Sequence, residues 1–240
     1  MDVEKRDAVA PGESDGAKAF DESTKLSNAT EQTPGQAPKS ADPSHVADGV
    51  PASQVRLAFL RAVLPAKGWY CCVVFEDGQK KHYWPKTIEE LAKVIEANDR
   101  PGCDVYFACA AYKKRGILYK GRSKDNVRAI KAFWFDIDLK KKNGDIVYPD
   151  KNAARKALFE FAAFAELPTP IVVDSGGGLH AYFILPHELT RDEWAPLARG
   201  LAEMAREHGL KFDPSRAADC ASILRPPGTM NRKKRGAQDD

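Results

Sequence analysis

The sequence lacks any long hydrophobic run. No apolar stretch of the 240-residue chain approaches the roughly 18 residues that a membrane-spanning helix needs. The N-terminus, MDVEKRDAVAPGESDG, also lacks the apolar core of a secretory signal peptide. We therefore expect no membrane partner and a cytoplasmic location.

Cysteine pairs with metal-binding spacing are absent too. The chain has five cysteines, none of them in a CxxC pair: Cys71, Cys72, Cys103, Cys109 and Cys220. An adjacent pair with scattered single cysteines does not match zinc-site spacing. We predict that they are reduced and mostly buried as small apolar residues.

Two phosphate-binding signatures are missing, because the sequence contains neither GxxxxGK nor GxGxxG. It also shows no internal repeat. Any nucleotide chemistry must therefore come from other residues.

Charge is distributed unevenly along the chain. Residues 1–54 hold ten Asp and Glu against five Lys and Arg, whereas residues 55–240 hold 24 against 32, a net charge of +8. The first segment is rich in Ala, Pro, Ser and Gly, so we predict a disordered acidic tail over residues 1–54. The basic remainder suits a phosphate-rich partner.

Beyond the tail, the patterns predict interleaved helices and strands. Capping boxes at Thr87–Glu90 and Thr190–Glu193 mark two helix starts. The predicted helices are 54–64, 87–98, 150–167 and 190–209. The predicted strands are 68–76, 80–86, 103–112, 130–139, two around the glycines of 172–185 and a short one over 223–225. This order, with several expected hairpins, predicts an α+β fold with a mixed or antiparallel sheet.

The segment FWFDIDL places Asp136 and Asp138 two residues apart on a predicted strand, so both side chains leave the same face. Two neighbouring carboxylates repel each other unless a cation neutralises them, and hard oxygen ligands suit Mg²⁺ or Mn²⁺. A solvent-facing pair at the end of a strand is the structural alternative.

The segment VVDSGGGLHAYFIL brings three glycines and a histidine between two apolar runs. A turn of small residues lets phosphates approach backbone amides at Gly177, and Ser175 and His180 can donate hydrogen bonds to them. Asp174 is either a further ligand or a turn-former, and we favour the turn-former. A structural histidine in an ordinary turn is the alternative.

A third candidate is DPSRAADCASILRPPGTMNRK. Asp213 precedes a proline and is interpreted as a turn-former. Asp219 precedes an apolar strand and is interpreted as a third carboxylate of a shared site. Arg225 lies within that strand among apolar residues, so it is a candidate to bind the phosphates.

In this order, the three segments resemble the motifs of the archaeo-eukaryotic primase superfamily, in particular its primase-polymerase branch carried by phages and plasmids. The acidic pair corresponds to Asp136 and Asp138, the small residue plus histidine to SGGGLH with His180, and the apolar or small residue plus Asp to Ala218–Asp219. The resemblance covers roughly residues 100–235. The zinc-binding cluster of the cellular primases has no counterpart.

The resemblance implies an RRM-like palm joined to a smaller α/β unit, which divides the predicted catalytic domain, 55–235, into parts 55–128 and 129–235. Residues 236–240 would be a tail, and because phage relatives often continue into a helicase we expect the chain to be the N-terminal part of a longer protein. The implied activity is template-dependent nucleotidyl transfer with two Mg²⁺ or Mn²⁺ ions, nucleoside triphosphates and a single-stranded DNA template.

Residue roles follow from the same resemblance. Asp136, Asp138 and Asp219 would hold the metal ions, and Ser175, Gly177, His180 and Arg225 would bind the nucleotide. Basic residues would follow the nucleic-acid backbone: Arg115, Arg122, Lys124 and Lys233, with the lysines of the LKKK turn, Lys140 to Lys142.

Two other functions stay open. A replication initiator or relaxase would nick DNA through a tyrosine such as Tyr182, but it needs a pair of metal-binding histidines where LHAYF supplies one. A non-catalytic nucleic-acid-binding module with a primase-like fold is the other, and the complete acidic set argues against it.

Overall fold

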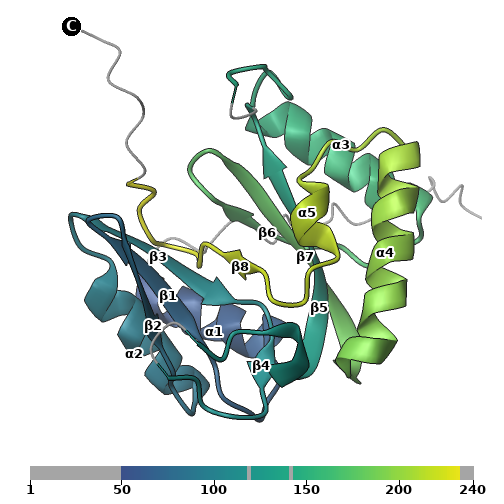
Figure 1. Ribbon diagram of the computed structural model, residues 1–240. Helices are drawn as coiled ribbons and strands as arrows, with labels where there is room; N and C mark the ends of the chain where they lie inside the picture. The colour runs from purple at the N-terminus through teal and green to yellow at the C-terminus, as the bar shows by residue number, and fades with distance from the viewer. Residues whose placement is uncertain (1–49, 118–119, 141–142, 233–240) are drawn as a thin grey trace, which may run out of the picture. The chain divides into compact units, whose positions relative to one another are not determined.

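The computed structural model describes residues 50–117, 120–140 and 143–232, and these form two four-stranded sheets in which every pairing is antiparallel (Figure 1). The protein is therefore α+β with antiparallel sheets, as predicted. Residues 1–49 of the predicted tail, Lys233 and the predicted tail 236–240 lie outside the described residues. The domain boundary near residue 128 stays a prediction.

The first sheet has the order β2-β1-β3-β8. Its strands are β1 (Cys72–Glu76), β2 (Gln79–Tyr83), β3 (Cys103–Ala108) and β8 (Ile223–Leu224). β1 and β2 form the predicted hairpin, closed by Asp77 and Gly78 at φ 47° and 78°. An Asp-Gly pair with positive φ suits the twist of a two-residue hairpin.

Two helices pack with the first sheet. α1 (Ala52–Val63) begins inside the segment predicted as tail, and α2 (Ile88–Asn98) begins at the predicted capping box, where the Thr87 side chain accepts from the Glu90 backbone N–H at 3.1 Å. Each helix buries an apolar face because its large apolar residues recur at helical spacing.

The second sheet has the order β4-β5-β7-β6. Its strands are β4 (Ala111–Tyr112), β5 (Val127–Asp138), β6 (Ile171–Asp174) and β7 (Gly178–Leu189). The prediction of one strand over 103–112 was wrong, because the chain leaves the first sheet after β3 and joins the second as β4. The Cys109 N–H still donates to the Ser222 carbonyl at 3.1 Å, which extends the β3–β8 register by one residue before the chain crosses to the second sheet.

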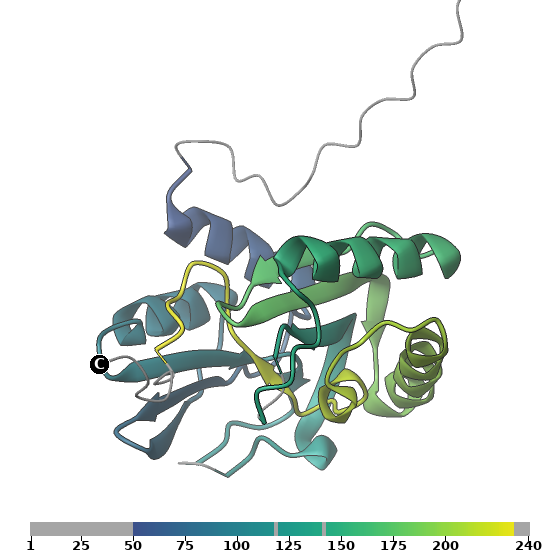
Figure 2. The ribbon, with the colours of Figure 1, turned by 90° about the horizontal axis from the view of Figure 1, so that it is seen from above.

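Helices α3 (Lys151–Phe164), α4 (Arg191–Glu207) and the short α5 (Pro214–Ala217) pack against the second sheet (Figure 2). The predicted helical turn near residue 124 is the 3₁₀ helix η1 (Lys124–Asn126). α4 is anchored by Trp194, whose ring stacks on Trp134 of β5 with a centroid distance of 4.8 Å. Its indole N–H donates to the Ala132 carbonyl at 3.0 Å.

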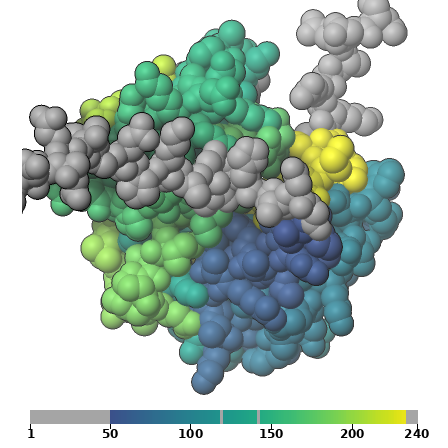
Figure 3. Space-filling model, turned by 180° about the vertical axis from the view of Figure 1, so that it is seen from behind, coloured from purple at the N-terminus to yellow at the C-terminus, as the bar shows by residue number. Residues whose placement is uncertain are grey.

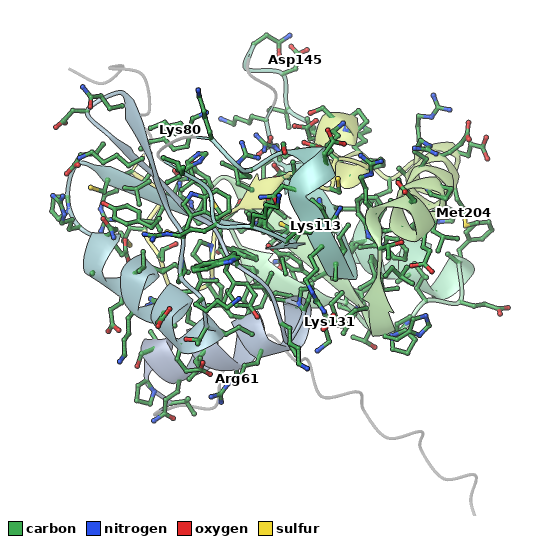
Figure 4. The ribbon with its side chains drawn as sticks, turned by 60° about the horizontal axis from the view of Figure 1, so that its bottom comes forward. Arg61, Lys80, Lys113, Lys131, Asp145 and Met204 are labelled. Atoms are coloured by element: carbon green, nitrogen blue, oxygen red, sulfur yellow. The ribbon has the colours of Figure 1, made fainter. Side chains whose placement is uncertain are left out.

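The two sheets are joined through α1. Phe59 makes edge contacts with Phe107 of β3 at 5.6 Å and with Tyr182 of β7 at 5.0 Å between ring centroids. In Figure 3 the blue surface of this helix meets the green surface of later residues. Lys131 of β5 also donates to the Arg61 carbonyl at 3.3 Å, and the two residues lie close together in Figure 4.

All five cysteines are buried and free, as predicted. Burial raises the pKa of Cys71 to about 12, so its thiol stays protonated near neutral pH. Among the helices of the described residues, none is long and apolar enough to span a membrane.

Candidate active site

β5 and β7 place the acidic pair opposite the histidine. In their antiparallel register Asp136 pairs with His180, and Asp138 pairs with Gly178. Directly opposed residues project from the same face of a sheet, so the Asp136 and His180 side chains meet. The distance from His180 Nε2 to Asp136 Oδ1 is 3.4 Å.

These side chains line a pocket of about 280 Å³, to which β5, β7, α5 and β8 contribute residues. The pocket brings together six residues predicted from the sequence: Asp136, Asp138, Ser175, Gly177, His180 and Arg225. It is also lined by three polar residues to which the sequence assigned no site role: Asp213, Arg216 and Asn231. The three predicted segments therefore do converge on one pocket.

His180 is buried, and only one of its two ring nitrogens contacts a protein group in the described part of the chain. Nε2 faces Asp136, whereas Nδ1 has no hydrogen-bond partner among the described atoms. A buried imidazole nitrogen without a partner is uncommon in a purely structural histidine. Of the two ring nitrogens, only Nε2 therefore has a protein partner within the described residues.

Asp136 contacts two nitrogen donors. Its Oδ1 faces His180, and its Oδ2 lies 3.2 Å from Arg216 Nε. The Asp136 side chain is only 14% exposed. The half-buried carboxylate is thus stabilised from two sides.

Asp213 is fixed beside Asp136 by the backbone. Its N–H donates to the Asp136 carbonyl at 2.7 Å, and its carboxylate caps α5 by accepting from the Ser215 N–H at 2.9 Å. The same carboxylate lies 3.5 Å from Arg216 Nε. The turn-forming role predicted for Asp213 is confirmed by the cap, but Asp213 also lines the pocket.

Asp219 lies after α5 and is absent from the described lining of this pocket. Its carboxylate accepts from the Ala221 N–H at 3.2 Å and lies 3.7 Å from Lys124 Nζ. In the turn that follows α5, Asp219 therefore faces Lys124. A signal for Asp213 was present in the sequence, because Phe212–Asp213 fits an apolar residue plus Asp as well as Ala218–Asp219 does.

The glycine turn that joins β6 and β7 has two structurally constrained positions. Gly176 has φ 87°, and a Cβ added there would lie 2.7 Å from Asn231 Cβ. A Cβ at Gly178 would lie 2.0 Å from the Ile137 carbonyl oxygen. At Gly177 the nearest atom would be Asn231 Nδ2, at 4.0 Å, so local packing does not require glycine there.

Asp174 shapes the same turn, as predicted. It accepts from the Gly176 N–H and from Lys151 Nζ, both at 2.8 Å. Burial alone would raise the pKa of Asp174, but these hydrogen bonds outweigh it and lower the pKa. Asp174 is therefore ionised and engaged at neutral pH.

Arg225 is 2% exposed, and its guanidinium joins several segments. It donates to Asp104 Oδ1 at 2.7 Å, to the Tyr106 hydroxyl at 3.1 Å and to Asn231 Oδ1 at 3.2 Å. Asn231 Nδ2 in turn donates to the Ser175 carbonyl at 3.0 Å. This chain of contacts, from β3 through Arg225 and Asn231 to the glycine turn, is called the Arg225 clamp below.

The basic residues predicted to follow nucleic acid lie apart from the pocket lining. Arg122 donates to the Ala221 carbonyl, Lys124 faces Asp219, and the Arg115 guanidinium lies 5.9 Å from the centre of the Trp69 ring. Lys140 is exposed, and Lys141, Lys142 and Lys233 lie outside the described residues. Their role stays a prediction.

Tyr182, the nucleophile of the relaxase alternative, is fully buried and its hydroxyl has no hydrogen-bond partner within the described part of the chain. Burial raises the pKa of Tyr182 well above its usual value. A protonated, inaccessible phenol cannot attack DNA, so the geometry opposes this alternative.

The donor set of the pocket fits a divalent cation. Asp136, Asp138 and Asp213 offer hard carboxylate oxygens to one cavity. Over residues 50–117, 120–140 and 143–232, no three His, Cys, Asp or Glu side chains form a preassembled metal group. Mg²⁺ is commonly bound by one or two carboxylates together with substrate phosphates and water, so the β5 pair suffices for an ion that shares its ligands with a nucleotide.

No protein-family model and no curated protein matches this sequence. Among solved structures, the chain is similar to the crystal structure of primase RepB', with a TM-score of 0.50 and 18% identity over 78% of this chain and 53% of that one. It spans about half the length of that primase. The likeness shows a shared fold, so the described residues have a primase-type fold.

Two further structures are similar at lower scores. The catalytic domain of primase RepB' in complex with initiator DNA gives a TM-score of 0.49 and 17% identity over 77% of this chain and 80% of that one. The polymerase domain of Mycobacterium tuberculosis ligase D in complex with DNA gives 0.46 and 12% identity over 76% of each chain.

Proposed function

We propose that this protein is a DNA primase-polymerase, a template-dependent nucleotidyltransferase that makes or extends DNA primers on a single-stranded template. The observation that carries the proposal is the pocket in which the paired aspartates of β5 face His180 and Asp213. The primase-type fold supports the same class of reaction.

Asp136 and Asp138 are proposed to hold the divalent ions, with Asp213 favoured as the third carboxylate because it lines the pocket and Asp219 does not. When bound, two Mg²⁺ or Mn²⁺ ions supply a clamp on the attacking 3′-oxygen and on the leaving pyrophosphate. β5 and the capped start of α5 fix the backbones that carry these carboxylates.

His180, Ser175 and Gly177 are proposed to bind the triphosphate of the incoming nucleotide. His180 contributes a ring nitrogen in a buried setting, where a charge-assisted hydrogen bond to phosphate is strong. Gly177 leaves space for phosphate oxygens beside the turn. Arg225 acts through Asn231 on the position of this turn, since its donors already bind protein acceptors.

The template is proposed to be single-stranded DNA, supported by the net charge of +8 over residues 55–240. Arg115, Arg122, Lys124 and Lys233 remain candidate contacts to its backbone. A helicase domain or subunit remains a proposed partner.

The test measures incorporation of labelled nucleotides on a single-stranded template, with and without a primer, in Mg²⁺ or Mn²⁺. The variants are Asp136→Asn, which removes one negative charge without changing side-chain volume, and His180→Ala. Asp145→Asn is the matched control, because Asp145 is exposed in the loop before α3, away from the strands (Figure 4).

We expect Asp136→Asn to lose synthesis, His180→Ala to bind nucleotide more weakly and Asp145→Asn to behave as wild type. Full synthesis by Asp136→Asn would refute the proposal. A wild-type protein that binds single-stranded DNA but neither Mn²⁺ nor nucleotide would point instead to the non-catalytic module.

A further inference from the structure

Arg216 lies where the proposed site would receive its cation. Its Nε is 3.2 Å from Asp136 Oδ2 and 3.5 Å from Asp213 Oδ2. One guanidinium therefore neutralises two of the three carboxylates that line the pocket. The resemblance gave Arg216 no role.

The backbone of Arg216 is fixed without help from its side chain. Its carbonyl accepts from the Trp134 indole N–H at 2.9 Å and from the Ser222 hydroxyl at 3.1 Å. The cap of Asp213 holds the start of α5. A change in the side chain should therefore leave the position of α5 intact.

The side chain itself is held more loosely. Besides the two carboxylates, the side chain makes a long hydrogen bond from Nη1 to the Ile223 carbonyl at 3.4 Å. The side chain is 39% exposed, whereas that of Asp136 is 14% exposed. Arg216 can thus turn towards solvent or along the pocket while Asp136 stays in place.

A divalent cation bound by Asp136 and Asp213 would meet Arg216 at short range. Two positive charges beside the same carboxylates repel each other, and this repulsion is poorly screened in a half-buried pocket. Cation binding therefore favours departure of the guanidinium. A nucleotide triphosphate in the pocket would provide Arg216 with a new anionic partner.

Resting on the function proposed above, we propose that Arg216 is an internal counter-ion that couples the binding of the metal to the binding of the nucleotide. Without ligands it holds Asp136 and Asp213 and weakens their affinity for a lone cation. With a nucleotide present it pairs with the triphosphate and leaves both carboxylates to the metal. Arg216 is thus a positioning residue for the carboxylates and a binding residue for the nucleotide.

The experiment titrates Mn²⁺ by calorimetry into the protein, alone and with a saturating nucleotide analogue that cannot react. The variants are Arg216→Gln, which removes the charge, and Arg216→Lys, which keeps it. Arg206→Gln is the matched control, because Arg206 lies on α4 and pairs with Glu203 at an exposed site. Urea unfolding in EDTA confirms that each variant is folded.

For Arg216→Gln we expect Mn²⁺ alone to bind on the order of tenfold more tightly than in wild type, within the usual range of coupling between two sites. The nucleotide should then add little to Mn²⁺ affinity, and the analogue itself should bind more weakly. Arg216→Lys should stay close to wild type, and Arg206→Gln should match it.

Equal Mn²⁺ affinities for wild type and Arg216→Gln would overturn the coupling while leaving the proposed function standing, provided Asp136→Asn abolishes Mn²⁺ binding. Absence of Mn²⁺ binding in wild type, with or without nucleotide, would overturn both. A gain in Mn²⁺ affinity with Arg206→Gln would show that net charge, and not the place of Arg216, sets the affinity.

Discussion

At the scale of single residues, we expect substitutions of Asp213 and Asp219 to have opposite effects on the rate of nucleotide incorporation: a loss at Asp213 and no change at Asp219. Asp213 lines the pocket and Asp219 faces Lys124 in a turn, so only Asp213 can contribute to a shared acidic site without rearrangement. We expect Asp213→Asn to lower the rate of nucleotide incorporation by about 100-fold or more, the scale of losing a group that stabilises the reacting charge.

Asp219→Asn is the matched control and should retain the wild-type rate. Both asparagines keep an acceptor for the local backbone N–H, so the cap of α5 and the turn after it should survive. Loss of activity in Asp219→Asn with full activity in Asp213→Asn would restore the assignment made from sequence.

The lowered pKa of His82 in β2 should make the stability of the fold depend on pH. Burial, followed by the nearby charge of Arg122, lowers the pKa of His82 from 6.5 to about 4, and neither ring nitrogen has a partner among the described atoms. The unfolded chain therefore binds more protons than the fold between these two values. The free energy of unfolding should fall as the pH drops from about 6.5 towards 4.

The measurement is urea unfolding of wild type and His82→Gln at pH 7, 6 and 5. Glutamine does not titrate, so the difference between the two proteins isolates His82 from the carboxylates that protonate at lower pH. Parallel pH profiles would show that His82 contributes nothing to this dependence.

At the scale of elements, the turn between β6 and β7 has two neighbouring glycines with different amounts of space for a side chain. A Cβ at Gly178 would meet the Ile137 carbonyl, a backbone atom that the β5–β7 ladder holds in place. We expect Gly178→Ala to lower the free energy of unfolding by roughly 1–3 kcal/mol, as overpacking does. Denaturant unfolding measures this change.

Gly177→Ala is the companion variant. Its Cβ would have open space, so stability should stay within about 0.5 kcal/mol of wild type while the affinity for nucleotide falls. Equal destabilisation by the two alanines would mean that the turn as a whole, and not the contact at Gly178, limits stability.

The helix starts and the division of the strands between two sheets show what the sequence can and cannot predict. Thr87–Glu90 and Thr190–Glu193 located two helix starts correctly, because a capping box is complete within four neighbouring residues. The break between β3 and β4 could not be found this way, since β3 pairs with β1 and β8 whereas β4 pairs with β5 in the other sheet. Local patterns predicted the elements, but not how distant segments divide them between two sheets.

The candidate site follows the same rule. Alternation along one strand predicted that Asp136 and Asp138 share a face, and the register with β7 then placed His180 opposite. The choice between Asp213 and Asp219 depends on how α5 docks, through the Asp213 N–H and the Asp136 carbonyl. Phe212–Asp213 and Ala218–Asp219 both fit an apolar or small residue followed by Asp, so only the tertiary contacts show which of the two aspartates lines the pocket.

At the scale of the whole described unit, the Arg225 clamp ties the first sheet to the glycine turn of the second. Arg225 and Asp104 form an ion pair at 2.7 Å, with the arginine side chain 2% exposed. Removing one partner of a buried pair leaves the other charge without compensation, which typically costs 3–5 kcal/mol. We therefore expect Arg225→Met to lower the free energy of unfolding by about 3 kcal/mol.

Arg61→Met provides the contrast, because Arg61 and Glu89 form an ion pair at 2.9 Å whose side chains are 58% and 50% exposed. Such a pair contributes about 0–1 kcal/mol, so this variant should unfold close to wild type. Hydrogen exchange should also speed up around Ser175 in Arg225→Met, because Asn231 loses the guanidinium that holds it. If both variants shifted the urea midpoint equally, the clamp would be no stronger than a surface ion pair.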